Sequence, residues 1–381
     1  MEINIFNGPK KEFESLIPYE YMTLPEFVFK YDAKKQTFHV ETNPPEKHYD
    51  ASVKEHIDCL VAFSENYAGI TEGAVQTFNN ILNECEIDEI YLQNPPKSII
   101  KLINENYDDV EHINYEYSSL TKEDFLKINE QFDKRIIGQE KAKRKILIAL
   151  YPLIKKYNKG KPITLMFYGR SGVGKTETAK FISEILDEKL FRKQFSMFQN
   201  VKFSEYLFGG SHMQSSFAKD LLERESNIIL LDEFDKAAHL FHEAFYQLFD
   251  EAIFEDNNYE VKLEDSIIIC TSNYHNLEEI RKNIGDPLFY RFDGIIKFDD
   301  LTNDAIEKII EITVNKKFEK LDPEDQKLID KQKIITLFSN NSNKLRNSRQ
   351  ISNLVEEKIN SDLLDSFIEN EKLNNEWYFK Y

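Results

Sequence analysis

Apolar residues alternate with polar ones early in the chain, which is the spacing of a half-buried β-strand. Phe27, Phe29 and Tyr31 follow this pattern, and Phe38 and Val40 resume it after a polar stretch. Two such runs on either side of a turn predict a β-hairpin.

The rest of the first third predicts short helices and one strand. We expect helices over residues 53–66 and 73–84, and a strand at residues 89–92. Asn94 is expected to cap a further helix, which carries Ile99, Ile100 and Ile103 at helical spacing. The order of these elements predicts a separate α+β domain over residues 1–120, with no catalytic cluster in it.

A helix start marks the end of this first domain. Thr121 and Asp124 form a capping-box pattern, with Asp in place of the usual Glu, and apolar residues recur after it at helical spacing. Over residues 121–297 the predicted strands and helices alternate, which indicates an α/β domain with a parallel sheet. The pattern is helical over residues 298–381, where we expect a C-terminal helical lid.

A glycine-rich loop follows a predicted buried strand over residues 163–168 and precedes a predicted helix. Residues 169–176 read GRSGVGKT and fit GxxxxGK[ST] in full. The backbone N–H groups of such a loop surround phosphates, and glycine lets the backbone approach them closely. Lys175 would reach the β- and γ-phosphates of ATP, and Thr176 would supply an oxygen to Mg²⁺. The expected nucleotide-binding residues of this loop are Gly169, Ser171, Gly172, Val173, Gly174, Lys175 and Thr176.

Two further strands are predicted to end in polar residues. The buried run at residues 228–231 ends in Asp232 and Glu233, and the run at residues 266–272 ends in Asn273. Beside a phosphate-binding loop, Asp232 is expected to hold Mg²⁺ and Glu233 to polarise the attacking water as a general base. Alone, the acidic pair could equally cap a helix. The nearby glycine-rich loop favours the interpretation that the pair binds Mg²⁺ and activates water.

The composition narrows the class of protein. Hydrophobic residues make up 41% of the chain, enough for folded cores, and no apolar run is long enough to span a membrane. The three cysteines, Cys59, Cys85 and Cys270, are far apart and form no metal or disulfide pattern. The first residues lack the features of a signal peptide, so a cytoplasmic protein is expected.

The chain is acidic, with a formal net charge of −18. Residues 1–130 contain 25 acidic and 11 basic side chains, so most of the excess lies in the first third. Because nucleic-acid binding draws most of its affinity from basic side chains on phosphates, a nucleic-acid partner is not expected.

Residues 133–360 resemble the ATPase module of the Clp-type AAA+ proteins and are similar to the second ring module of ClpB and ClpC. The resemblance covers more than half of the chain, and its motifs occur in the family's order. Besides the glycine-rich loop, the resemblance rests on five segments, namely IIGQEKA at 136–142, LDEFDKA at 231–237, TSN at 271–273, DPLFYRFD at 286–293 and NSR at 347–349. The NSR segment stands where the family has Gly-Ala-Arg.

The resemblance implies roles that the pattern alone leaves open. Ile136 and Ile137 would pack on the adenine, and Asn273 would help to orient the attacking water. Arg291 would be an arginine finger that reaches the γ-phosphate of a neighbouring subunit, and Arg349 would be the second sensor on the lid. A finger that acts across an interface implies a homo-oligomeric ring, and the family implies a hexamer.

The sequence departs from the threading unfoldases of this family at residues 206–214, which read YLFGGSHMQ. The Gly-aromatic-Val-Gly loop that grips substrate in those relatives is missing, as it is in the torsins. Phe208 and Met213 are the only bulky candidates for such a grip, and Phe208 is expected to pack in the core. Threading of a polypeptide is therefore not expected.

These features together predict a Mg²⁺-dependent ATPase that remodels or controls a protein partner bound through residues 1–120. An ATP-gated oligomeric switch or scaffold that recruits an effector, for example in a bacterial defence system, is the first alternative. A nucleic-acid-linked motor or loader is the second, and the acidity and the Clp-like motifs count against it.

Overall fold

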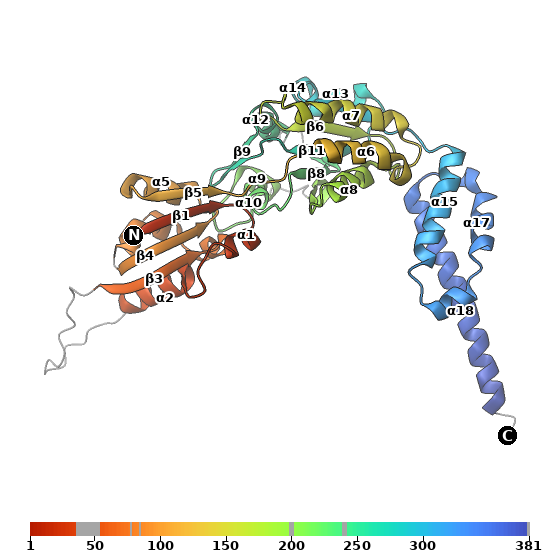
Figure 1. The fold of residues 1–381 in the computed structure, drawn as a ribbon, viewed down its shortest axis with the longest axis horizontal. Helices are drawn as coiled ribbons and strands as arrows, with labels where there is room; N and C mark the ends of the chain where they lie inside the picture. The colour runs from red at the N-terminus through yellow and green to blue at the C-terminus, as the bar shows by residue number, and fades with distance from the viewer. Residues whose placement is uncertain (36–53, 77, 84, 198–201, 238–241, 379–381) are drawn as a thin grey trace.

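The computed structural model describes residues 1–35, 54–76, 78–83, 85–197, 202–237 and 242–378. It has a parallel sheet at the N-terminal end, a second parallel sheet in the middle and a group of helices at the C-terminal end (Figure 1). The second half of the expected hairpin, at Phe38 and Val40, lies outside the described residues.

Among the described residues, five parallel strands form the N-terminal sheet in the order β2-β3-β4-β1-β5. They are β1 (Glu2–Asn7), β2 (Met22–Thr23), β3 (Glu55–Ala62), β4 (Cys85–Gln93) and β5 (Val110–Asn114). Helical segments connect them, as parallel neighbours require. These are α1 (Lys10–Glu14), α2 (Leu24–Lys35), η1 (Ser64–Gly69), α3 (Glu72–Gln76), α4 (Phe78–Leu82) and α5 (Lys97–Asn106).

The parallel sheet corrects the α+β description of this third of the chain to α/β. The residues expected in a hairpin strand form α2, in which Leu24 and Phe27 are buried three positions apart while Phe29 is 78% exposed. The helix expected at residues 53–66 is largely β3, whose second half is buried on both faces.

Other expectations for this third are confirmed. Helices α3 and α4 cover residues 73–84 in large part, and the strand at residues 89–92 lies within β4. Helix α5 carries the expected isoleucines, but its N-cap is Pro96 rather than Asn94. The side chain of Asn94 instead binds the backbone of Gly8.

In the part of the chain that the structure describes, five parallel strands also form the second sheet, in the order β12-β6-β11-β8-β7. They are β6 (Ile163–Tyr168), β7 (Phe191–Gln194), β8 (Ile228–Asp232), β11 (Ile267–Ser272) and β12 (Gly294–Lys297). The helices around it are α6 (Lys122–Arg135), α7 (Glu140–Lys155), α8 (Lys175–Ile185), α9 (Lys202–Phe208), α10 (Phe217–Leu222), α12 (Tyr246–Glu251), α13 (Leu277–Ile284) and α14 (Asp286–Phe289). The short strands β9 (Ile253–Glu255) and β10 (Glu260–Lys262) form an antiparallel hairpin beside it.

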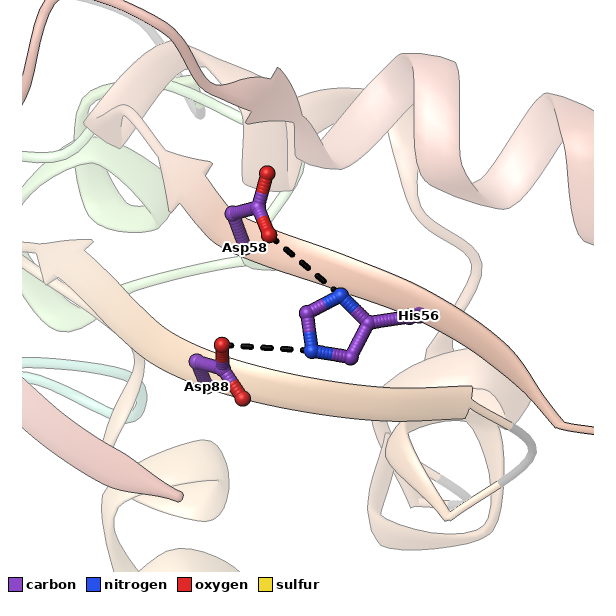
Figure 2. A group of neighbouring side chains, drawn as sticks. All are labelled: His56, Asp58 and Asp88. Atoms are coloured by element: carbon purple, nitrogen blue, oxygen red, sulfur yellow. Dashed lines mark ion pairs between the residues drawn. The ribbon is translucent and has the colours of Figure 1, made fainter.

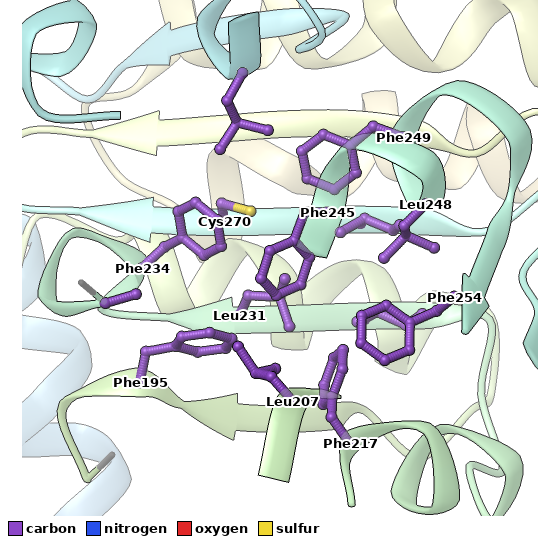
Figure 3. Packing of buried hydrophobic residues seen from close by; sticks show 14 of the residues in the cluster. Phe195, Leu207, Phe217, Leu231, Phe234, Phe245, Leu248, Phe249, Phe254 and Cys270 are labelled. Atoms are coloured by element: carbon purple, nitrogen blue, oxygen red, sulfur yellow. The ribbon is translucent and has the colours of Figure 1, made fainter. Parts of the chain in front are cut away.

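Successive residues of the central strands point to opposite faces of this sheet and enter two different cores. Leu230 belongs to a cluster with residues of α6, α7 and α8, whereas Leu231 belongs to an aromatic cluster. In that second cluster the rings of Phe217, Phe245 and Phe254 pack together, with centroids 4.9 to 6.1 Å apart (Figure 3). Burial on both faces explains why these strands read as continuous apolar runs.

The C-terminal helices form the predicted lid, with an apolar core of their own. They are α15 (Asn303–Phe318), α16 (Pro323–Leu328), α17 (Lys331–Ser339) and α18 (Ser348–Tyr378). The capping box at Thr121 is also confirmed, because its side chain accepts from the N–H of Asp124 at the start of α6. Within the described part of the chain, none of the helices combines the length and apolarity needed to cross a membrane.

Candidate nucleotide-binding site

The glycine-rich loop connects β6 to α8, as the sequence predicts. Gly169 and Gly174 have φ of +137° and +114°, in the region that favours glycine. A side chain at position 169 would place its Cβ 2.4 Å from the carbonyl oxygen of Phe298. The loop therefore needs glycine for its backbone conformation and, at Gly169, for space.

Lys175 is the first residue of α8, and its side chain turns back into the loop. Its Nζ donates to the carbonyl oxygens of Gly169 at 2.6 Å and Arg170 at 2.8 Å, and to Oδ1 of Asn273 at 3.2 Å. Burial lowers the pKa of Lys175 to about 8, although Asp235 and Asp232 act in the opposite direction. A buried cation is thus held where the loop presents its backbone to phosphates.

Asp232, at the tip of β8, receives hydrogen bonds from three neighbouring elements. The hydroxyls of Thr271 and Thr176 lie 2.5 and 3.3 Å from its Oδ1. The guanidinium of Arg192 donates to Oδ2 through Nη2 at 2.5 Å and through Nε at 3.1 Å. The structure therefore brings together Thr176 and Asp232, the two residues predicted to hold Mg²⁺.

Glu233 follows β8 in a left-handed backbone conformation, with φ of +56°. Its backbone N–H donates to the hydroxyl of Thr271 at 3.0 Å, and Nε2 of Gln194 donates to its Oε2 at 3.2 Å. Because the same Thr271 hydroxyl donates to Asp232, one side chain links the two acidic residues. Both carboxylates are thus positioned by residues of the adjacent strands.

Two adjoining cavities contain nearly all the predicted site residues. The polar one, of about 220 Å³, is lined by the predicted residues Ser171, Gly172, Gly174, Lys175, Thr176, Asp232, Glu233, Asn273 and Arg349. The second, of about 410 Å³, is lined by Ile136, Ile137 and Val173 together with lid residues that include Leu301, Ile309 and Ile312. Both share Gly172 and Gly174, so a polar space for phosphates adjoins an apolar space that suits a nucleotide base.

The lid is tied to the glycine-rich loop at the start of α18. Ser348 donates from its backbone N–H at 3.0 Å and from its hydroxyl at 2.9 Å to the carbonyl oxygen of Gly172. A Cβ at position 172 would lie 2.7 Å from that of Asn347. Arg349 follows directly and lines the polar cavity. A shift of the lid would therefore move Arg349 relative to the phosphate-binding loop.

Arg291 is not among the residues that line these cavities. Its Nε donates to Oδ2 of Asp250 at 2.7 Å, and its guanidinium lies 4.6 Å from the ring centroid of Tyr246. The structure thus places this side chain away from its own chain's site. Its action on a neighbouring subunit stays a prediction.

Residues 161–369 match the family model described as AAA domain (Cdc48 subfamily). The match covers more than half of the chain and includes the glycine-rich loop, both acidic residues and the start of α18. The chain belongs to this family.

The similar proteins are Clp-type AAA+ ATPases, and so is this chain, as its sequence motifs imply. It is 25% identical over 270 residues to the chaperone protein ClpB of Malacoplasma penetrans, covering 65% of this chain and 38% of that protein. It is 31% identical over 177 residues to the AAA+ ATPase ClpV1 of Pseudomonas aeruginosa, covering 43% of this chain and 20% of that protein. The chain spans less than two fifths of the length of either relative.

A solved structure of related fold is Hsp104 in a closed state with ATPγS and FITC casein. It matches with a TM-score of 0.57 and 14% identity, over 97% of this chain and 89% of that one. At this identity the likeness shows the fold alone. It confirms an AAA+ α/β fold with a helical lid.

Four residues of this AAA site were not identified from the sequence. Thr271 and Ser348 lie within the TSN and NSR segments, so these two motifs could have identified them as site residues. Arg192 and Gln194 lie on β7, whose sequence fits no motif, and only the pairing of β7 with β8 brings them to the acidic residues.

The segment at residues 206–214 differs from its expected packing. Phe208 is 37% exposed, so its predicted place in the core is wrong; the neighbouring Leu207 of α9 is fully buried instead. Met213 is exposed, whereas His212 is buried, with its Nε2 2.8 Å from the carbonyl oxygen of Ile70. This segment therefore contacts the N-terminal part of the chain.

His56, Asp58 and Asp88 form a second group of metal-ligand types, on β3 and β4 (Figure 2). Nδ1 of His56 lies 3.3 Å from Asp58, and Nε2 lies 3.2 Å from Asp88. Each ring nitrogen thus faces a carboxylate, and all three residues are exposed. This arrangement fits a surface ion-pair group and gives no reason to assign a metal.

Proposed function

We propose that this Clp-type ATPase hydrolyses ATP with Mg²⁺ and uses the reaction to remodel or control a protein partner. The observation that carries this proposal is the convergence of Lys175, Thr176, Asp232, Glu233 and Asn273 around one polar cavity. They come from the carboxyl ends of β8 and β11 and from the start of α8, where a parallel sheet positions catalytic groups.

Each residue of the cavity has a distinct chemical task in this proposal. The Lys175 ammonium would replace its carbonyl partners with the β- and γ-phosphates of ATP. Thr176 and Asp232 would hold Mg²⁺, an ion that prefers oxygen ligands and keeps several waters. Glu233 would accept a proton from the attacking water while Asn273 helps to orient it.

The lid and the apolar cavity supply nucleotide recognition in this account. Ile136 and Ile137 would cover one face of the adenine, since they line the apolar cavity beside the loop. Arg349 would sense the γ-phosphate from the lid, and Ser348 would keep the start of α18 close to the loop.

We further propose a homo-oligomeric ring, with a hexamer favoured. Arg291 has no place in its own chain's cavity, and its pairing with Asp250 holds it outside. A finger supplied across an interface gives this arginine a function, because developing charge on the γ-phosphate needs a cation beyond Lys175.

Residues 1–120, 121–297 and 298–381 would act as a recognition unit, an ATPase body and a lid. The first unit has its own sheet and core and carries most of the chain's net negative charge. A unit with its own core can fold and move separately from the ATPase body. Partner binding is therefore assigned to residues 1–120 in this proposal.

An ATP-gated switch is a second candidate, favoured by the packing around residues 206–214. The carbonyl oxygens of Gly209 and Gly210 accept from the side chains of Asn257 and Asn258, and His212 is buried against the N-terminal unit. A segment held in this way is a poor candidate for a mobile grip on a threaded chain. Control of a partner without threading fits this packing better.

Stimulation of ATP hydrolysis distinguishes these functions. We expect hydrolysis that is stimulated by an unfolded protein if the chain remodels polypeptides, and basal hydrolysis that neither protein nor DNA stimulates if it is a switch. Stimulation by DNA alone would refute both. The Glu233→Gln variant serves as the control without hydrolysis.

A further inference from the structure

The carboxylate of Glu223, which follows α10 in the ATPase body, is held by the N-terminal sheet. Nε2 of Gln93 lies 3.0 and 3.1 Å from its two oxygens, and Nδ2 of Asn94 lies 2.8 Å from Oε1. The backbone N–H of Lys10 donates to Oε2 at 3.2 Å. Three groups of one unit therefore converge on one carboxylate of another.

The two amides that hold Glu223 are themselves fixed. Gln93 and Asn94 are fully buried. Oε1 of Gln93 accepts from the N–H of Ser64 at 3.1 Å, and Oδ1 of Asn94 accepts from the N–H of Gly8 at 2.9 Å. Because both oxygens are used in this way, both NH₂ groups must face the carbonyl oxygen of Gly8 and the carboxylate.

The backbone of Gly8 and Asn94 also has features that support these contacts with Glu223. Asn94 has φ of +46°, a conformation that costs energy for a residue with a side chain. A Cβ at Gly8 would lie 2.5 Å from that of Tyr115, so no other residue fits there without movement. The left-handed backbone of Asn94 and the close contacts of Gly8 thus hold these two strand ends in one arrangement.

These groups lie at the carboxyl ends of β1 and β4, which are neighbours in the sheet. The chain leaves β1 toward β2 on one side of the sheet order and leaves β4 toward β5 on the other. Because parallel crossovers are right-handed, these two connections cover opposite faces of the sheet. Open parallel sheets bind their ligands at such points.

We propose that this carboxylate crevice, formed by Gly8, Lys10, Gln93 and Asn94, is a binding site for carboxylates and that Glu223 is its built-in occupant. A carboxylate from a small organic acid or from an acidic protein side chain would compete with Glu223 for the same donors. The inference rests on the proposed recognition role of residues 1–120. It adds to that role the chemical group that would be recognised, a carboxylate. It also links the binding of this group to α10 of the ATPase body, because Glu223 follows that helix.

Competition with a tethered group explains how such a site would be regulated. Glu223 is present at a high effective concentration, so a free carboxylate binds the wild-type chain more weakly than a chain without Glu223. Removing the Glu223 carboxylate should therefore reveal the site.

The test uses the full chain with Glu223→Ala, which leaves space close to the size of acetate. Acetate is expected to raise the melting temperature of this variant and to bind it at least about tenfold more tightly than the wild type. Acetamide, which has the same shape without the charge, is expected to do neither. Glu225→Ala is the matched control, because Glu225 pairs with Lys189 outside the crevice.

A second substitution shows whether the crevice itself binds acetate. Gln93→Leu combined with Glu223→Ala removes a donor, and acetate binding should be lost. A peptide with a single Glu, compared with the same peptide carrying Gln, shows where the natural carboxylate comes from. If the Glu peptide binds Glu223→Ala more tightly than acetate does, the natural ligand is a protein side chain. If acetate binds and the Glu peptide does not, the natural ligand is a small acid. Equal effects of acetate and acetamide, or no effect of acetate on folded Glu223→Ala, would overturn the proposal.

If Glu223→Ala does not fold, Glu223→Gln provides the test. Its amide places an NH₂ group against the donors of the crevice, so amide hydrogen exchange at residues 93 and 94 should accelerate about tenfold or more. Unchanged exchange would refute the role of the carboxylate. None of these measurements uses ATP hydrolysis or partner binding. The carboxylate site can therefore fail its test while the proposed function stands, and the proposed function can fail while the carboxylate site stands.

Discussion

Arg192 donates two hydrogen bonds to Oδ2 of Asp232, at 2.5 and 3.1 Å. The carboxylate proposed to hold Mg²⁺ is therefore paired with a cation on the neighbouring strand β7. A guanidinium and a metal ion compete for the same oxygens. Occupation of the site by Mg²⁺ and ATP must then loosen this pair or move Arg192 toward the phosphates.

Arg192→Ala removes the competitor for Asp232. We expect the Mg²⁺ concentration that gives half-maximal ATP hydrolysis to fall, because the carboxylate no longer has to leave a charged partner. Arg281→Ala is the matched control, since Arg281 pairs with Asp286 outside the cavities. A Mg²⁺ requirement that is unchanged or higher in Arg192→Ala, measured by titration at saturating ATP, would contradict this account.

Nucleotide affinity should depend on pH through Lys175. Burial lowers its pKa to about 8, so in the free protein the ammonium loses its proton as pH rises through 8. Phosphates bind the charged form, so affinity is full below this pH and declines above it. We expect the Kd for ATP to be about tenfold higher at pH 9 than at pH 7, measured by calorimetry. Lys175→Ala should bind weakly at both pH values, and an equal decline in that variant would rule out Lys175 as the cause.

Arg291→Ala should separate binding from hydrolysis. We expect ATP affinity close to that of the wild type and a turnover reduced by roughly a thousandfold, the loss typical when an arginine finger is removed. Mixing this variant with Glu233→Gln chains should restore part of the activity, because some interfaces then combine an intact finger with an intact base. A chain that stays monomeric with ATP by light scattering and hydrolyses it at full rate would refute the ring.

The segment at residues 206–214 should not support processive unfolding. We expect no ATP-dependent unfolding of a stable tagged protein, because this segment is held by Asn257, Asn258 and the N-terminal unit. Phe208 and Met213 are nevertheless exposed, so they provide the decisive variants. Unfolding that occurs in the wild type and is lost in Phe208→Ala or Met213→Ala would show that the segment grips substrate.

Partner binding should depend on residues 1–120. Their deletion is expected to leave basal ATP hydrolysis near that of the full chain and to abolish binding of a partner that co-purifies with the ATP-trapped protein. Binding that survives the deletion would place recognition elsewhere in the chain.

The arrangement of the site residues was predictable because these residues follow local patterns. A glycine-rich loop, an acidic strand end and the Asn273 segment each occupy a few consecutive positions, and their strands are buried runs that a parallel sheet explains. The partners on β7 were not predictable in this way. Arg192 reaches Asp232 only because β7 pairs with β8, and the order of strands in a sheet cannot be predicted from any short segment of sequence.

The first third shows the limit of reading periodicity over a few residues. Phe27 and Phe29 alternate like strand residues, yet Leu24 and Phe27 at helical spacing are the buried pair. The apolar content of residues 53–66 predicts a helix, although a strand buried on both faces, such as the second half of β3, has the same apolar content. The Glu223 crevice depends on contacts across more than a hundred residues and had no local signal.

The most direct test of the central claim is ATP hydrolysis by Glu233→Gln. The amide keeps the shape of the side chain but cannot accept the proton of the attacking water. We predict ATP binding close to that of the wild type, measured by calorimetry, together with a single-turnover rate that falls by roughly a hundredfold or more. Turnover at the wild-type rate in Glu233→Gln would contradict the account.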